Sequence, residues 1–153
     1  MIDVDLNSPL KSANILIIDD SIPFQNLTNE MLLKFGVNSV EFASSLSEGL
    51  KKLNYTSSDR SSFKTYDMVL LDINLPDGNG INGCNFVTHH VNTLNIPVII
   101  ISGVYSPLIV AEVFRLGASD FIQKPFVSEL LKKRLCNALN DAMFEEPALS
   151  VNE

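Results

Sequence analysis

Cysteine, positive charge and long apolar runs are all scarce in this chain of 153 residues. Its two cysteines, Cys84 and Cys136, lie far apart and match no C-x-x-C or Cys/His ligand spacing, which disfavours both a disulfide and a zinc site. We expect both to be small apolar groups on helices. The 11 basic residues are outnumbered by 18 acidic ones, and the net charge of −7 argues against direct binding of nucleic acid.

Membrane and nucleotide-binding signals are missing as well. No apolar stretch approaches the ~20 residues that a membrane-spanning helix needs, and the start, MIDVDLNSPLK, lacks the basic and apolar regions of a secretory signal. We therefore expect a cytoplasmic protein with no membrane contact. Neither G-x-G-x-x-G nor G-x-x-x-x-G-K-[ST] follows an apolar run, so a flavin- or nucleotide-binding module is disfavoured.

What the chain does contain is a repeated alternation of apolar runs and helical patterns. Strands are expected at residues 13–18, 39–43, 68–72, 98–101 and 119–123. Five such strand–helix units indicate a single doubly wound α/β domain, with a five-stranded parallel sheet and helices on both faces. The expected limits are a polar lead at 1–12, the domain at 13–142 with an exposed polar loop at 54–65, and a tail or linker start at 143–153.

Local signals predict where the helices begin and end. Ser21 is a candidate N-cap and Gly36 a C-terminal stop, while Ser45 with Glu48 three residues later forms a capping-box pattern. Further apolar or cap positions are expected for Phe24, Leu27, Met31 and Phe35 in the first helix, Leu46, Leu50 and Leu53 in the second, Cys84, Val87, Val91 and Leu94 in the third, Ser106 and Pro107 at the start of the fourth, and Leu131, Leu135 and Leu139 in the fifth. The adjacent His89 and His90 have no second ligand at a suitable spacing, so we interpret them as polar-face or partly buried side chains.

Chemically active residues follow four of the predicted strands. Asp19 and Asp20 follow the first strand, Asp72 ends the third, Ser102 the fourth and Lys124 the fifth. The carboxyl ends of parallel strands meet at one edge of a sheet, so these groups should converge. Closely packed carboxylates either raise one another's pKa or bind a cation, and a cluster of oxygens suits Mg²⁺.

Such a cluster can transfer a phosphoryl group. A carboxylate beside a divalent ion can attack phosphorus and form an acyl phosphate, which assigns the attack to Asp72. Asp19 and Asp20 would hold the metal directly or through water. Lys124 would pair with one phosphoryl oxygen and Ser102 would donate to another.

The four motifs that carry these residues resemble one known family. IDDS, LLDINLPDGNG, IISG and GASDFIQKPF are similar to the receiver domain of bacterial two-component response regulators, over about residues 13–139. The resemblance implies a flavodoxin-like sheet of order 2-1-3-4-5 and phosphorylation of Asp72 by a sensor histidine kinase or a phosphotransfer histidine. It also implies Mg²⁺ bound by Asp19, Asp20, Asp72 and the backbone carbonyl of Asn74.

The resemblance further implies a switch and an output. Ser102 and Phe121 match the family's switch positions, and the Lys124–Pro125 bond is often cis in the family. Phosphorylation would draw Ser102 inward and open space for Phe121, whose states differ by packing alone because it lacks the hydroxyl of the more frequent tyrosine. The partners are then a downstream effector or output domain.

The fourth predicted helix, residues 106–116, carries more apolar residues than one buried stripe requires. Val110 and Phe114 lie beside the stripe made by Ile109, Val113 and Leu116. They form either a broad core face or a patch for a homodimer or a target.

Two other functions compete with a phosphorylated receiver. An aspartate-nucleophile phosphatase of the haloacid dehalogenase class also begins D-x-D, but here the second acid is replaced by Asn74. A degenerate receiver would bind partners without phosphorylation, against which the complete set of acids, Ser102 and Lys124 argues. Beyond its own phosphorylation and dephosphorylation we expect no enzyme activity, and the domain could stand alone or belong to a longer protein.

Overall fold

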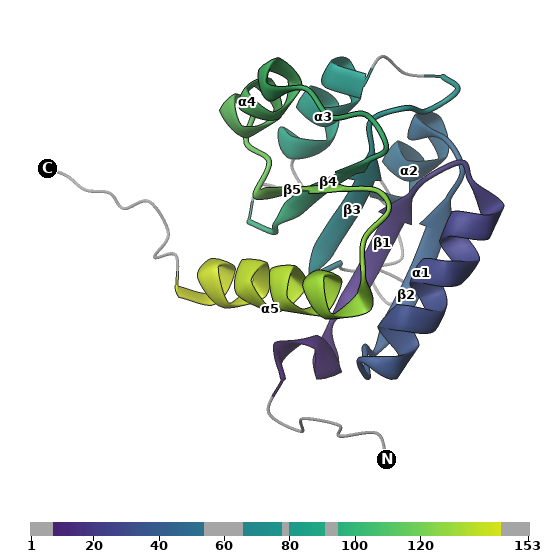
Figure 1. Cartoon of the computed structure of the whole chain (residues 1–153), viewed down its shortest axis with the longest axis vertical. Coiled ribbons are helices and arrows are strands. Elements are labelled where there is room, and N and C mark those ends of the chain that lie inside the picture. Colours follow the sequence, from purple (N-terminus) through teal and green to yellow (C-terminus); the bar gives the residue numbers. More distant parts are fainter. Residues whose placement is uncertain (1–7, 54–65, 78–79, 91–94, 145–153) are drawn as a thin grey trace, which may run out of the picture.

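Five parallel strands form one sheet in the order β2-β1-β3-β4-β5 (Figure 1). The computed structural model describes residues 8–53, 66–77, 80–90 and 95–144. Its strands are β1 (Asn14–Ile18), β2 (Ser39–Ala43), β3 (Met68–Asp72), β4 (Val98–Ser102) and β5 (Asp120–Gln123). The predicted parallel sheet, its strand order and the positions of its strands are confirmed.

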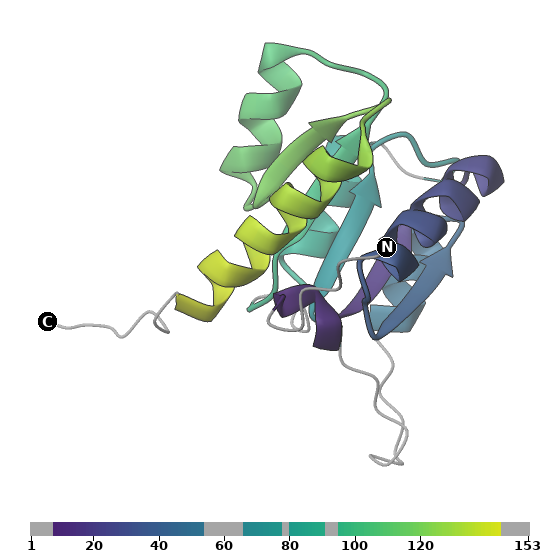
Figure 2. The ribbon, with the colours of Figure 1, turned by 60° about the horizontal axis from the view of Figure 1, so that its bottom comes forward.

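Helices cover both faces of this sheet (Figures 1 and 2). They are η1 (Pro9–Ser12, a 3-10 turn), α1 (Ile22–Lys34), α2 (Leu46–Leu53), α3 (Gly80–Thr88), α4 (Pro107–Arg115) and α5 (Ser128–Phe144). Alternate residues of β1 point to opposite faces: Leu16 and Ile18 pack with α2, α3 and α4, whereas Ile15 and Ile17 pack with α1 and α5. The fold is therefore the doubly wound domain that the sequence predicts.

Helix α1 begins and ends where predicted, but one of its four expected apolar positions is exposed. The Ser21 hydroxyl accepts from the N–H of Phe24 at 3.3 Å, and Gly36 takes a φ of 85°, which favours glycine. Leu27, however, is 48% exposed. The fully buried positions are Gln25, Thr28 and Leu32. Phe24, Met31 and Phe35 are partly buried against the same core, so Leu27 is the expected apolar position that was wrong.

The other helix ends follow the expected signals with three differences. In the capping box, the Ser45 hydroxyl accepts from the N–H of Glu48 at 3.0 Å, but the Glu48 carboxylate accepts from Ser44 rather than from Ser45. Ser106 precedes α4 without a side-chain capping bond. Helix α3 ends at Thr88, while the expected apolar positions 91 and 94 lie outside the described residues.

The packed part of the chain begins before residue 13. Leu10, in turn η1, is fully buried with the residues of α5, although the expected lead at 1–12 treats it as unpacked. At the other end α5 continues through Phe144, two positions past the expected limit. The loop at 54–65 lies outside the described residues. Among the described helices none has the length and apolarity needed to cross a membrane.

Candidate functional site

Three acidic side chains gather at the carboxyl ends of β1 and β3, which are neighbours in the sheet. One carboxylate oxygen from each of Asp19, Asp20 and Asp72 lies within 4.8 Å of the others. Asp19 is 1% exposed and Asp72 is 7% exposed, whereas Asp20 is open to solvent. The convergence predicted from the strand ends is therefore present, and it forms a set of oxygen donors suited to a hard cation.

Lys124 bridges two of these acids. Its Nζ lies 2.8 Å from Asp19 Oδ2 and 3.1 Å from Asp72 Oδ2. The backbone N–H of Lys124 donates to the carbonyl of Ser102 at 2.8 Å, which ties the residue to the end of β4. The bond from Lys124 to Pro125 is cis, as in many members of the family that the sequence resembles. One ammonium thus pairs with two largely buried carboxylates.

The remaining oxygens of these acids are held by backbone groups. Asp19 Oδ1 accepts from the N–H of Ser21 at 2.8 Å, and Asp72 Oδ1 accepts from the N–H of Asn74 at 3.0 Å. Burial raises the pKa of Asp72 above its ordinary value, and the charge of Asp19 adds to this, while the Asn74 N–H and Lys124 oppose it. Asn74 is exposed beside the cluster, and the role of its carbonyl stays a prediction.

The two expected switch residues lie on adjacent strands and are both buried. Ser102 is fully buried, and its hydroxyl accepts from the N–H of Val104 at 3.1 Å. Phe121 is 9% exposed and packs with the cluster beneath α2, α3 and α4. The ring of Tyr105 meets it edge-on, with centroids 6.3 Å apart. The aromatic ring is therefore already inward here, and its expected movement stays a prediction.

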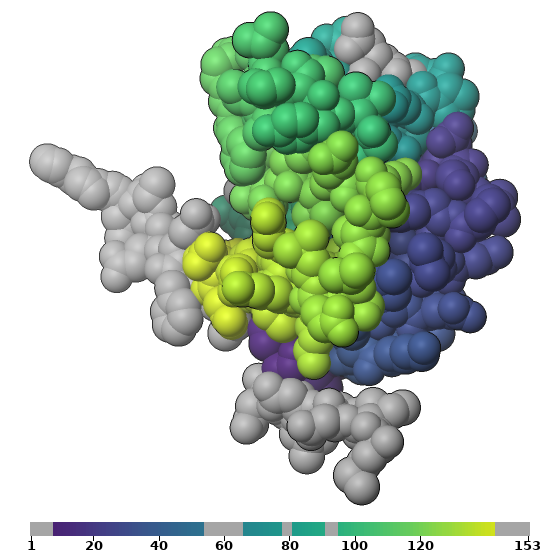
Figure 3. Space-filling view, viewed as in Figure 1, coloured from purple at the N-terminus to yellow at the C-terminus, as the bar shows by residue number. Residues whose placement is uncertain are grey.

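The expected patch on α4 has one partly buried and one exposed member. Val110 is partly buried against the core, as a broad core face would require, whereas Phe114 is 44% exposed. Other apolar side chains accompany Phe114: Leu108 is 82% exposed and Tyr105 is 57% exposed. Helix α4, drawn in green, reaches the surface in the upper part of Figure 3. Exposed apolar side chains are therefore present on and beside α4, and Leu108 is one of them. The role of Val110 and Phe114 as a partner patch stays a prediction.

Two residues at the site were not predicted from the sequence. The Phe24 ring lies under the Lys124 ammonium, with Nζ 3.8 Å from the ring centroid. The buried carboxamide of Gln25 donates to the Asp19 carbonyl and to the Ser44 hydroxyl. Both lie in the first turn and a half of α1. The Ser21 cap signals that turn, but the sequence does not indicate which way the turn faces.

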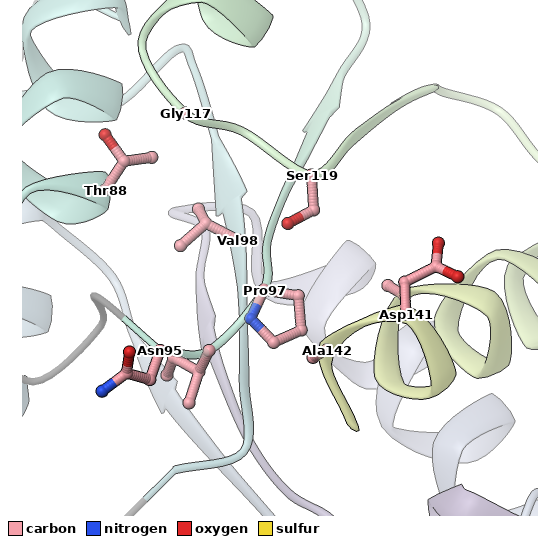
Figure 4. Close-up of a pocket in the computed structure, with 10 residues that line it drawn as sticks. Thr88, Asn95, Pro97, Val98, Gly117, Ser119, Asp141 and Ala142 are labelled. Atoms are coloured by element: carbon pink, nitrogen blue, oxygen red, sulfur yellow. The ribbon is translucent and has the colours of Figure 1, made fainter. Parts of the chain in front are cut away.

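A well-formed pocket lies at the opposite end of the strands (Figure 4). It has a volume of about 240 Å³. Its lining comes from the start of β4, the residues before β5 and the end of α5: Asn95, Pro97, Val98, Ser119, Asp141 and Ala142 among others. Because the acid cluster lies at the carboxyl ends of the strands, this pocket is separate from the candidate site.

The cysteines and His89 match the structural roles expected for them. Cys84 is buried in α3, and burial raises the pKa of its thiol to about 11. Cys136 is partly buried in α5, and both cysteines are free. The exposed His89 pairs its Nδ1 with the carbonyl of Asn85, and the described residues bring no acid or thiol cluster around it.

Comparison with known proteins agrees with this fold. The profile of the response regulator receiver domain matches residues 15–136. A probable transcriptional regulatory protein of Picosynechococcus is 30% identical over 138 residues, which cover 90% of this chain and 52% of that protein. The cell cycle transcriptional regulator CtrA of Caulobacter vibrioides is 32% identical over 124 residues, or 79% of this chain and 47% of the relative.

The structural comparison supports the same fold. The crystal structure of a CheY-like receiver domain protein from Methanospirillum hungatei has a TM-score of 0.76 at 24% identity, with 88% of this chain and 99% of that one covered, and so shares the fold. The chain spans between 16% and 52% of the length of the first curated relatives it matches. On the profile match over most of its length, this chain belongs to the family of response regulator receiver domains.

Proposed function

We propose that this receiver domain accepts a phosphoryl group on Asp72 from a sensor histidine kinase or a phosphotransfer histidine. The observation that carries the proposal is the position of Lys124, whose ammonium lies 3.1 Å from Asp72 and 2.8 Å from Asp19. A cation shared by two carboxylates at the end of a central strand is the arrangement that phosphoryl transfer to a carboxylate needs, because the incoming oxygens are negatively charged.

In the transfer, an Asp72 carboxylate oxygen forms a bond to phosphorus. The bond between phosphorus and the donor's imidazole nitrogen breaks, and its electron pair stays on that nitrogen. Lys124 pairs with one phosphoryl oxygen. The Ser102 hydroxyl, which accepts from the N–H of Val104, keeps its own proton free to donate to another phosphoryl oxygen. Catalysis extends no further than this phosphorylation and its reversal by water.

The acid cluster suits Mg²⁺ as the cofactor. Asp19, Asp20 and Asp72 each offer a carboxylate oxygen within 4.8 Å of the others, and Asp20 is open to solvent, which leaves room for the waters that Mg²⁺ retains. The backbone carbonyl of Asn74 is the fourth proposed protein ligand. When bound, the ion would neutralise part of the charge on the phosphoryl oxygens.

The proposed readout is the surface beside Ser102 and Phe121. A phosphoryl group adds about 1.5 to 2 negative charges next to the buried Ser102. The Ser102 main chain continues into the loop that carries Tyr105, and Tyr105 contacts Phe121. A change there would alter the exposed side chains of Leu108 and Phe114, which we propose as the patch for a downstream effector, an output domain or a second copy.

The proposal keeps two further expectations from the sequence. The net charge of −7 disfavours direct contact with nucleic acid. Relatives named as transcriptional regulators are roughly twice as long as this chain, so we propose that contact with nucleic acid, where it occurs, belongs to an output domain or partner. A cytoplasmic location without membrane contact completes the proposal.

Incubation with acetyl phosphate and Mg²⁺, followed by intact mass, tests the acceptor. One added phosphoryl group is expected, labile to hydroxylamine and absent without divalent metal or in Asp72→Asn. Asp67→Asn is the matched control, because this exposed aspartate precedes the same strand β3 at its opposite end. Persistent labelling of Asp72→Asn, or loss of labelling in the control, would contradict the assignment of Asp72.

A further inference from the structure

The ring of Phe24 lies against the only lysine of the described site. Lys124 Nζ is 3.8 Å from the ring centroid, close enough for a cation–π interaction. Phe24 is itself fixed at two points. Its backbone N–H donates to the Ser21 cap, and its ring meets the ring of Phe126 edge-on, with centroids 5.7 Å apart at 86°. The face of Phe24 is therefore a fixed feature beside Lys124.

The three contacts of the ammonium differ in one respect. Its two carboxylate partners, Asp19 and Asp72, are also proposed ligands of Mg²⁺, so their oxygens are shared between Lys124 and a second cation. The face of Phe24 makes no such second contact, because a ring presents a diffuse negative charge that suits an ammonium and gives a hard ion no oxygen. Only this contact can persist unchanged when the carboxylates are engaged.

We propose that Phe24 is a positioning residue that holds the Lys124 ammonium beside Asp72 when Asp19 and Asp72 are occupied by metal. This inference rests on the proposed function. Phe24 acts through Lys124 and makes no contact with the phosphoryl group. Without the ring face, Lys124 is free to sample other rotamers. Its ammonium then pairs with the phosphoryl oxygen for a smaller fraction of the time. Phosphorylation of Asp72 should then slow by about three- to tenfold.

The rate test compares substitutions that keep apolar volume but differ in the ring. Phe24→Leu removes the π face, whereas Phe24→Tyr retains it and should restore at least half of the wild-type rate with acetyl phosphate and Mg²⁺. Phe35→Leu is the matched control, because Phe35 ends the same helix and is partly buried against the same cluster. This control should lose a similar amount of stability in urea and leave the rate within twofold of wild type.

A second readout needs no phosphorylation. The Lys124 ε-methylene protons, identified by their absence from the NMR spectrum of Lys124→Met, should be shifted upfield by the ring current of Phe24. The shift should be lost in Phe24→Leu and should persist when Mg²⁺ alone is added to the wild-type domain. Loss of the shift on addition of Mg²⁺ would overturn the proposal, because the ring would not then hold the ammonium.

A double-mutant cycle separates positioning from packing. In the Lys124→Met background, Phe24→Leu should change the rate by less than twofold, since the residue that it positions is gone. An undiminished effect would mean that Phe24 acts otherwise, and the proposal would be wrong. If the wild-type domain is not phosphorylated on Asp72 at all, the proposed function fails, whereas a phosphorylated wild type with an unaffected Phe24→Leu refutes this inference alone.

Discussion

The carboxylate of Asp77 accepts a hydrogen bond from the backbone N–H of Leu46 at 2.8 Å, although the two residues are 31 positions apart. Its other oxygen accepts from Ser47 at 2.9 Å. These are the first N–H groups of α2, which a helix leaves without internal partners. Asp77 lies in the loop that leaves β3, so the loop that directly follows the proposed acceptor also caps α2.

Substitution of Asp77 should therefore change the acid stability of the domain. The two backbone bonds lower the pKa of Asp77 below its ordinary value of 3.8. A lowered folded pKa contributes stability that is present above the unfolded pKa and lost as pH falls through the folded one. Asp77→Asn should reduce stability at pH 7 and flatten its decline toward pH 3, as measured by urea unfolding. Asp141→Asn removes an equal charge from α5 and serves as the control for the loss of one negative charge. Superimposed profiles for Asp77→Asn and wild type would contradict the capping role.

Removal of Lys124 should destabilise the domain most when divalent ions are absent. Lys124→Met leaves the carboxylates of Asp19 and Asp72 close together, largely buried and without their ammonium, which should cost about 1–3 kcal/mol of unfolding free energy in a chelator. Added Mg²⁺ should recover most of this loss, because it would restore positive charge. Urea unfolding with and without Mg²⁺ measures both effects.

The control for Lys124 is an ion pair nearer the surface. Lys52 lies 3.5 Å from Glu41, with both side chains partly exposed. Lys52→Met should therefore cost no more than about 1 kcal/mol and should show no dependence on Mg²⁺. Equal losses for Lys52→Met and Lys124→Met in the chelator would mean that the acid cluster does not depend on Lys124.

Much of the fold and the acid cluster could be predicted because short-range patterns encode them. Apolar runs such as Met68–Leu71 indicate buried strands, and parallel strands place the residues that follow them at one edge. This pattern predicts that Asp19, Asp72 and Lys124 lie close together, although it gives no distances between them. Caps such as Ser21 act within three residues, so they too are visible in the sequence.

The features that could not be predicted depend on how elements rotate against one another. A helical pattern places Phe24 in the first turn of α1 but does not say that its ring faces Lys124, 100 positions later. The bond from Leu46 to Asp77 crosses from one unit to the next. Leu10 lies in the lead before the first strand, where no helical or strand periodicity marks it as buried. On α4, Val110 and Leu108 have similar side chains, and only the rotation of the helix decides which is exposed.

The two cysteines should differ sharply in reactivity. Cys84 is fully buried, and burial raises the pKa of its thiol to about 11, so almost no thiolate is present at pH 8. Cys136 is only partly buried, with its Sγ 3.8 Å from the hydroxyl of Ser8. Iodoacetamide should add one group rapidly, at Cys136, and a second only in urea. Peptide mass mapping identifies the sites, and Cys136→Ser should abolish the rapid addition; rapid modification of Cys84 would contradict its burial.

Two helical glycines should respond in opposite directions to the same substitution. A Cβ on Gly49, in α2, would lie 2.5 Å from Cδ1 and 2.8 Å from Cγ1 of the fully buried Ile18, so the Ile18 side chain, α2 or β1 must move. Gly49→Ala should therefore lower the unfolding free energy by about 1–3 kcal/mol. A Cβ on Gly83, in α3, would meet Leu46 at an ordinary 3.6 Å. Gly83→Ala should be neutral or stabilise by up to about 1 kcal/mol, because alanine favours a helix.

Ile18→Val tests whether the close approach of the Ile18 side chain to Gly49 is the reason that Gly49→Ala destabilises the domain. Valine lacks Cδ1, the nearest of the two atoms, so it should relieve part of the clash. The double variant Gly49→Ala with Ile18→Val should lose less stability in urea than the sum of the two single variants. Strict additivity would mean that Gly49→Ala acts through something other than Ile18.

Since Ile18 directly precedes Asp19, a shift that relieves the clash by moving β1 should also displace the acid. Gly49→Ala should then weaken Mg²⁺ binding in a titration, whereas Gly83→Ala should not.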